Sequence, residues 1–155
     1  MSTDDPPRPG SRRARPGYSR RLRCGLLSAE LWLERGRVAA RVGGDLDVFS
    51  AGDLGAALSL AQREAPDAAV LFLLHELGFS DSSGLGVFVG AFKRARAAGG
   101  AVALVGVPDY LVKTLRITGL TAYLPSFSTF EEAWDWMERR PDPAASRKRL
   151  EPRHY

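Results

Sequence analysis

The sequence predicts an α/β fold built on a mixed, mainly parallel β-sheet with four α-helices. Apolar runs of strand length alternate with amphipathic stretches of helical length, which is typical of strand–helix–strand units with right-handed crossovers. Two runs, residues 68–74 and 101–107, are almost continuously apolar, which indicates central strands covered on both faces. A hairpin at the start makes the sheet mixed, and the expected order is β-β-α-β-α-β-α-β-α.

The 155 residues suffice for one domain with a sizeable core. We expect the domain over residues 28–140, between an N-terminal tail (1–27) and a C-terminal tail (141–155). The N-terminal tail is rich in Pro, Arg, Ser and Gly and is predicted to be disordered, because it has little apolar surface to bury. It holds seven Arg and two Asp, whereas the domain holds 11 basic and 14 acidic side chains, so the excess basic charge lies in the tails.

Composition excludes several classes of protein. The only cysteine, Cys24, allows no disulfide and no cysteine-based metal site. No apolar run approaches the roughly 18–20 residues of a membrane span, and no apolar core follows the Arg-rich N-terminus as it would in a secretory signal. The arginines lack an aromatic platform on which bases would stack. We therefore expect a cytoplasmic monomer that binds neither membranes nor nucleic acid directly.

The first half of the predicted domain is a hairpin, a helix and a buried strand. Gly36 suits the hairpin turn. Ser50 is the expected helix N-cap, and Asp53 in the first turn suits the helix dipole. The predicted elements are strands at residues 31–34 and 38–42, a helix at 51–65 and a strand at 68–74.

The second half alternates helices with strands. Gly99 and Gly100 stop the first of these helices, and Thr129 with Glu132 three residues later makes a capping-box pattern for the last helix. The predicted elements are a helix at residues 85–98, a strand at 101–107, a helix at 109–116, an edge strand at 123–124 and a helix from 130.

The candidate site is the strand-to-helix turn Asp81-Ser82-Ser83-Gly84, within residues 79–90. The hydroxyls lie where the first free backbone N–H groups of a helix point. This turn does not fit a hydrolase, because a nucleophile elbow needs Gly two residues before and two after the serine. Ser82 has only the second of these glycines and Ser83 has neither. His75 sits at a strand end and His154 in the tail, so no base is indicated, and we do not expect an enzyme.

Cofactor sites are not indicated either. Gly84, Gly86 and Gly90 imitate a dinucleotide fingerprint, but no acid ends the following strand to hold a ribose. Three loop acids, Asp45, Asp47 and Asp81, are candidates for a weak cation site, yet capping of loops and helices explains them better. The sequence thus predicts no cofactor and no metal.

A regulatory modification suits this turn better. A phosphate adds about −1.5 to −2 charges and three acceptor oxygens, and a helix N-terminus tolerates it. Gly84 and Gly86 are expected to keep the approach to the turn clear. Beside Asp81, and near Asp45 and Asp47 if those loops are adjacent, a phosphate makes the face strongly negative. A docked partner would then lose affinity, by about 3 kcal/mol or roughly a hundredfold.

These residues resemble a known family, the STAS domains, and within it the bacterial anti-sigma factor antagonists. The resemblance covers about residues 30–138. Four segments carry it: Gly44-Asp45-Leu46-Asp47, Phe79-Ser80-Asp81-Ser82-Ser83-Gly84-Leu85-Gly86, Leu115-Arg116-Ile117-Thr118-Gly119-Leu120 and Phe130-Glu131-Glu132-Ala133.

The resemblance implies a STAS-like fold and a partner-switching role in transcription regulation and stress response. In this family the unphosphorylated antagonist binds an anti-sigma factor that is also a serine kinase, and the sigma factor is released. The kinase uses ATP to phosphorylate the serine after the motif Asp, and a serine phosphatase reverses this. Carried over, the phosphoacceptor is Ser82, and the expected partner-binding residues are Asp45, Asp47, Asp81, Ser82, Ser83, Gly84 and Leu85.

The chain departs from the family pattern at three places. Leu73 stands where the family often has an acid, His75-Glu76 replaces small or polar turn residues, and the Arg-rich tail is outside the pattern. The alternative function is a constitutive STAS scaffold or adaptor subunit in a larger signalling or lipid-transport complex.

Overall fold

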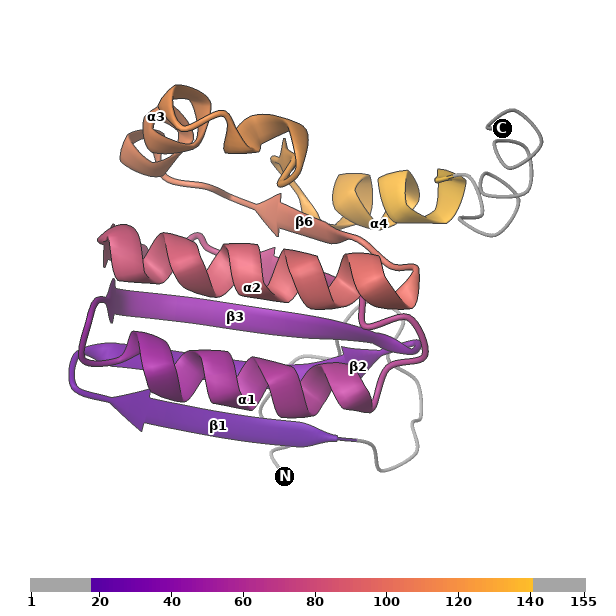
Figure 1. The fold of residues 1–155 in the computed structure, drawn as a ribbon, viewed down its shortest axis with the longest axis horizontal. Coiled ribbons are helices and arrows are strands. Elements are labelled where there is room, and N and C mark those ends of the chain that lie inside the picture. Colours follow the sequence, from indigo (N-terminus) through magenta and orange to yellow (C-terminus); the bar gives the residue numbers. More distant parts are fainter. Residues whose placement is uncertain (1–17, 141–155) are drawn as a thin grey trace, which may run out of the picture.

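The computed structural model describes residues 18–140, and the two ends of the chain, 1–17 and 141–155, lie outside the described residues. Within the described part, seven strands form one sheet (Figure 1). The strands are β1 (Ser19–Cys24), β2 (Leu27–Glu34), β3 (Arg37–Leu46), β4 (Val70–Leu73), β5 (Leu77–Ser80), β6 (Val102–Val105) and β7 (Ser126–Phe127).

Residues 18–140 also form four α-helices and one short 3₁₀ helix. The predicted mixed α/β class with four helices is therefore confirmed. The helices are α1 (Ala51–Arg63), α2 (Ser82–Ala98), α3 (Asp109–Ile117), η1 (Leu120–Ala122) and α4 (Phe130–Arg139).

The sheet has the order β1-β2-β3-β4-β6-β7, and β5 also pairs with β3. The β1–β2 and β2–β3 pairs are antiparallel, and all other pairs are parallel. β4 and β6 lie in the middle, which confirms the two continuously apolar runs as central strands. The long strand β3 uses its first part to pair with β4 and its last part to pair with β5.

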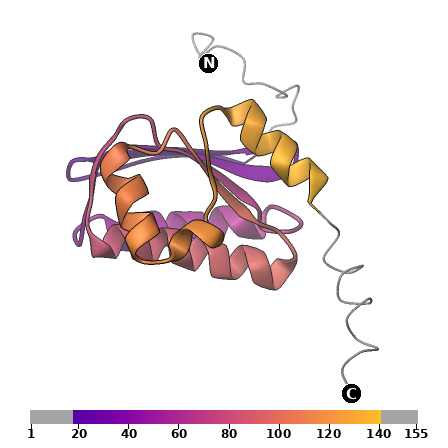
Figure 2. The same ribbon diagram turned by 90° about the horizontal axis from the view of Figure 1, so that it is seen from above.

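Helices cover both faces of the sheet. Figure 2 shows α1 and α2 together on one face and α4 on the other. The main core lies under α1 and α2, where Phe72 of β4 meets Phe88 of α2 in an edge-to-face contact with ring centroids 4.9 Å apart. A smaller apolar cluster lies under α4, around Leu71, Trp134 and Met137. We call the face of the sheet that α4 covers the α4 face.

Order begins earlier than the sequence predicts. β1 lies within residues 1–27, for which the sequence predicts disorder, and that prediction is wrong for Ser19–Cys24. Leu22 and Tyr18 pack against the main core, and every residue of β1 pairs with β2. Pairing with an otherwise open sheet edge thus outweighs the polar, Arg-rich composition of this segment.

Three smaller expectations also fail. β5, which leads into α2, is absent from the predicted order because its segment contains Gly78 and only its first residue, Leu77, is buried, so it lacks the apolar run of β4 and β6. The predicted edge strand at 123–124 is instead a turn that follows η1, and the strand there is β7, after Pro125. Ser50 occupies the N-cap position of α1 but makes no side-chain capping bond.

The capping box of α4 gives a test of local stability. Thr129 Oγ1 accepts a hydrogen bond from the N–H of Glu132 at 3.1 Å, and the Glu132 carboxylate accepts from the Thr129 N–H at 3.4 Å. Thr129→Ala should lower the free energy of unfolding by about 1 kcal/mol in urea titrations, because it removes the cap. Thr129→Ser keeps the hydroxyl and is the control. Equal losses in both variants would show that the cap is not the cause.

Candidate functional site

Two acidic loops meet at the carboxyl edge of the sheet. Leu46 of β3 pairs with Ser80 of β5 in parallel register, and the Asp81 N–H donates to the Leu46 carbonyl at 3.2 Å. Loops that follow parallel strands emerge at the same edge. The structure therefore brings Asp47, directly after β3, beside Asp81, directly after β5.

The N-terminus of α2 is capped by the acid and not by a hydroxyl. Asp81 has extended backbone, and its Oδ1 accepts a hydrogen bond from the Gly84 N–H at 3.1 Å. Ser82 is the first helical residue and its side chain is exposed, whereas Ser83 is half-buried. Since Asp81 satisfies the cap, the Ser82 hydroxyl stands at the helix N-terminus without being needed to start the helix.

Gly84 and Gly86 have different roles. Gly84 is buried, and a Cβ there would collide with Ser80 Oγ and lie 3.0 Å from Leu46 Cγ. Gly84 thus lets the first turn of α2 pack directly on β3 and β5, and the adjacent Leu85 packs against the core. At Gly86, by contrast, a Cβ would meet nothing within 4 Å, so Gly86 alone leaves open space beside the turn.

The loop after β3 is held in shape by Asp47. Its Oδ1 accepts hydrogen bonds from the N–H groups of Phe49 at 3.0 Å and Ser50 at 3.2 Å, and from Ser50 Oγ at 3.1 Å. Ser50 Oγ in turn accepts from the Asp47 N–H at 3.0 Å. These bonds replace the predicted Ser50 cap. They also fix Val48 and Phe49 in solvent, with 66% and 84% of each residue exposed.

Asp45 faces a different neighbour. Burial raises the pKa of Tyr110, and the Asp45 carboxylate adds to that rise, so the ring at the start of α3 lies within electrostatic range of Asp45. The Tyr110 hydroxyl donates to the Leu77 carbonyl at 3.5 Å. Asp45 therefore lies at the same edge of the sheet but belongs to the side of the site that α3 borders.

Exposed apolar side chains are contributed to this edge by four segments. They come from the β1–β2 turn, the β3–α1 loop, β5 and the start of α3. We call Leu26, Val48, Phe49, Phe79 and Tyr110 the apolar rim; their exposed fractions run from 38% to 84%. The Leu26 carbonyl accepts from the Asp45 N–H at 3.1 Å, which ties the turn to the acidic centre.

Sequence reasoning missed the rim. The available signal was the apolar pair Val48-Phe49 inside a polar loop, followed by Phe79 two residues before Asp81. Apolar groups scattered singly on a surface are ordinary, but a gathered set around one polar centre marks an interaction site. The arrangement is thus suited to contact another protein.

The site offers little for catalysis. The hydrogen bond with Asp53 raises the pKa of the Cys24 thiol, with smaller contributions from burial and from the charges of Asp53 and Asp47. A protonated thiol is a poor nucleophile. His75 lies beside Gly106 and lines another pocket, while His154 is outside the described residues.

Residues 18–140, the described part of the chain, were searched for clustered metal ligands and for membrane-spanning helices. In this part of the chain, no group of three or more His, Cys, Asp or Glu residues is arranged to hold a metal ion. None of its helices is long and apolar enough to cross a membrane.

Comparison with known proteins agrees with this architecture. A family model described as the STAS domain matches residues 34–133. The anti-sigma-B factor antagonist of Bacillus subtilis is 34% identical over 83 residues, which is 54% of this chain and 74% of the relative. That of Listeria monocytogenes is 40% identical over 81 residues, which is 52% of this chain and 69% of the relative.

A solved structure extends the comparison to three dimensions. The Bacillus cell fate determinant SpoIIAA in its phosphorylated form superposes with a TM-score of 0.58 and 27% identity, over 69% of this chain and 96% of that one. These relatives are named for a regulatory role and not for a reaction. The chain belongs to the STAS domain family, within the group of anti-sigma factor antagonists.

Proposed function

We propose that this chain is a phosphorylation-switched anti-anti-sigma factor. In its unphosphorylated form it binds an anti-sigma factor with serine kinase activity, which then releases a sigma factor, and a serine phosphatase restores this form. The observation that carries the proposal is the position of Ser82, whose exposed hydroxyl stands at the first residue of α2 while Asp81 caps the helix.

A phosphate on Ser82 changes the charge of the edge without breaking the fold. The free N–H groups and dipole of α2 favour a negative group at this point, so the helix is retained. Asp81 and Asp47 already place negative charge on this edge. The phosphate therefore adds about two charges to a surface that is already acidic. SpoIIAA, which has the same fold, is known in a phosphorylated form.

The apolar rim supports a protein as the partner. Leu26, Phe49 and Phe79 lie exposed on three separate segments that converge at the acidic edge. Such groups supply binding free energy when a partner removes them from water, about 25 cal/mol per Å². Phosphate at the centre of the contact opposes this gain, because a doubly charged group must lose water when the partner docks.

The rest of the proposal follows from a binding role. The chain works without catalysing a reaction, as a monomer in the cytoplasm, and it acts on transcription through its protein partner. The residues that contact the partner are the apolar rim and the members of the sequence-predicted set that are not buried, namely Asp45, Asp47, Asp81, Ser82, Ser83 and Leu85. Gly84, also in that set, is buried against β3 and β5 and supports the turn from within.

The first test locates the phosphate. Incubation of the full chain with its cognate kinase and ATP should give one phosphate on Ser82 by mass spectrometry, because that hydroxyl is the exposed one. Ser82→Ala should abolish modification, whereas the matched variant Ser83→Ala should retain it. Undiminished phosphorylation of Ser82→Ala would refute this assignment.

The second test measures the switch itself. Phosphorylation of Ser82 should weaken binding to the kinase by roughly a hundredfold, or about 3 kcal/mol, in calorimetry. Ser82→Asp should weaken binding in the same direction, since it places one negative charge at the same point, and Ser82→Ala should bind like the unmodified chain. If the unmodified chain, the phosphorylated chain and both variants bound with equal affinity, the chain would be a constitutive scaffold.

The third test concerns the apolar rim. Phe49→Ala should weaken partner binding by about 2 kcal/mol, because an exposed aromatic anchor is lost. It should leave the free energy of unfolding within about 0.5 kcal/mol, because the ring makes few contacts in the free domain. Leu60→Ala, which removes an exposed apolar side chain towards the other end of α1, is the control and should change neither quantity. Loss of binding in Leu60→Ala but not in Phe49→Ala would place the interface elsewhere.

A further inference from the structure

A pocket of about 230 Å³ lies between the C-terminal half of α2 and the segment formed by η1 and the turn that follows it. Five of the residues that line this pocket are apolar or aromatic, and they come from these two segments alone. They are Val89 and Phe92 of α2, and Leu120, Tyr123 and Leu124 of the η1 segment. We call this space the α2–η1 pocket.

The apolar walls of the pocket are held by contacts within the domain itself. The rings of Phe92 and Tyr123 contact each other, with centroids 5.5 Å apart and an interplanar angle of 57°. Leu124 is 1% exposed, and its N–H donates to the Leu120 carbonyl at 2.9 Å. Gly119, with φ of 77°, makes the turn between α3 and η1. The walls are therefore formed before any ligand binds, as is usual for small-molecule sites.

Two cations complete the lining of the pocket. Lys93 and Arg96 are both exposed, and both line the same space as the apolar residues. The Arg96 guanidinium lies over the Phe92 ring, 6.0 Å from its centroid, which holds its charge beside the apolar wall. No salt bridge within residues 18–140 involves Lys93 or Arg96. In this part of the chain, no carboxylate is paired with either charge.

Acidic residues are scarce in the sequence around the pocket. Residues 82–130, which include α2, α3 and η1, hold five basic residues and one acid, Asp109 at the start of α3. None of the residues that line the pocket is acidic. Lys93 lies 11 residues after Ser82, or about 16 Å further along the helix. The pocket thus favours an anion and is separate from the proposed phosphorylation site.

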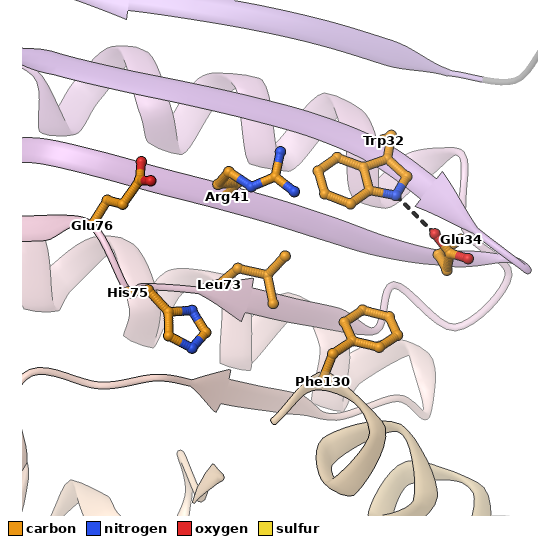
Figure 3. Close-up of a pocket in the computed structure, with 7 residues that line it drawn as sticks. All are labelled: Trp32, Glu34, Arg41, Leu73, His75, Glu76 and Phe130. Carbon is orange, nitrogen blue, oxygen red and sulfur yellow. Dashed lines mark hydrogen bonds between the residues drawn. The ribbon is translucent and has the colours of Figure 1, made fainter. Parts of the chain in front are cut away.

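The pocket on the α4 face does not offer the same combination (Figure 3). It measures about 290 Å³, and its lining includes charges of both signs, Arg41 with Glu34 and Glu76. Some of these groups bind one another or their neighbours: the Trp32 indole N–H donates to Glu34 Oε1 at 2.9 Å, and Arg41 donates to a nearby carboxylate at 2.8 Å. By contrast, the charged groups that line the α2–η1 pocket are all positive.

The size and chemistry of the α2–η1 pocket favour a small, rigid ligand. Pockets for drug-sized ligands measure about 300–1,000 Å³, so a space of about 230 Å³ suits a molecule of one or two rings. An aromatic ring can make offset or edge-to-face contacts with Phe92 and Tyr123. A carboxylate can form charge-assisted hydrogen bonds with a guanidinium and an ammonium group.

We propose that the α2–η1 pocket binds a small aromatic carboxylate. The rings of this ligand lie against Phe92, Tyr123 and Leu124, and its carboxylate is bound by Lys93 and Arg96. The inference does not rest on the proposed partner switch, because no residue of the pocket belongs to the acidic edge or to the apolar rim. Either proposal can therefore fail without the other.

Titration of the isotope-labelled full-length chain with naphthoate, followed by NMR, tests the proposal. We expect the amides of Lys93, Arg96, Leu120 and Leu124 to shift, with a dissociation constant on the order of 1 mM for a molecule of this size. Naphthamide, which has the same rings but no charge, should bind about fivefold more weakly because it loses the ion pairs. Acetate, which has the charge but no rings, should cause no such shifts at the same concentration.

Matched double variants identify the groups that bind the carboxylate. Lys93→Gln with Arg96→Gln should lower the affinity for naphthoate about fivefold and leave that for naphthamide unchanged, because only charge is lost. Lys113→Gln with Arg116→Gln removes the same charge from exposed positions of α3 outside the pocket and should change neither affinity. Tyr123→Ala removes part of the wall and should weaken binding of both compounds. Amide shifts of β4 and β6 report that each variant is folded.

Four results would overturn the proposal. The first is a titration without saturable shifts at the pocket. The second is equal affinity for naphthoate and naphthamide, which would show that the pocket does not recognise the carboxylate. The third is a set of shifts centred on Arg63 and Arg94, which would place the anion at the ends of α1 and α2. The fourth is tighter binding of decanoate than of naphthoate, which would make a flexible alkyl acid the occupant.

Discussion

The parallel register of β3 and β5 is the constraint on which the rest of the site depends. The Asp81 N–H bond to the Leu46 carbonyl continues that pairing to the point where α2 begins. It fixes where the helix starts, and so it fixes which residue is first in the helix. The irregularity at Gly44 makes the register possible: Gly44 has φ of 82°, and a Cβ there would collide with the Leu26 carbonyl. The turn that carries Leu26 can then close over β3.

Asp47 and Asp81, which follow these two strands, have a structural role as well as an electrostatic one. Asp81 caps α2 and Asp47 organises its own loop, so each carboxylate is held in place by backbone N–H groups. Their charges are therefore fixed beside Ser82. A cap contributes about 1 kcal/mol to a helix, and here that contribution comes from an acid, which leaves the neighbouring hydroxyl available for modification. Stability and the acidity of the edge rest on the same side chains.

The sequence predicts those features that depend on local pattern. Apolar runs locate β4 and β6, Gly99 ends α2, and Thr129 with Glu132 caps α4. The sequence does not predict β1, because this polar segment becomes a strand only by pairing with the edge of β2 in the folded sheet. That Asp47 lies beside Asp81 follows from the sequence only if the loops after β3 and β5 are assumed to be adjacent. The sequence does not show which strands pair, because pairing is decided by the tertiary structure.

The apolar rim shows the same limit. Phe49 and Phe79 are thirty residues apart in sequence and come together through the β3–β5 pairing, so no short window of sequence contains the patch. The sequence suggests Gly84 as an opening beside the turn, yet Gly84 is a point of close packing between α2 and the sheet. A glycine in sequence indicates small size, and only the folded neighbours decide whether the space is open or filled.

A phosphate on Ser82 also meets opposing forces inside the domain. The N-terminus of α2 attracts it, typically by 0.3–1 kcal/mol, while a carboxylate about 4 Å away in water repels a unit charge by about 1 kcal/mol. These terms have opposite signs, so the helix N-terminus offsets part of the repulsion that the phosphate meets inside the domain. A docked partner removes the water that screens the carboxylates and the phosphate, and repulsion then grows as the dielectric falls. Phosphorylation of Ser82 therefore destabilises the complex with the partner more than it destabilises the domain itself.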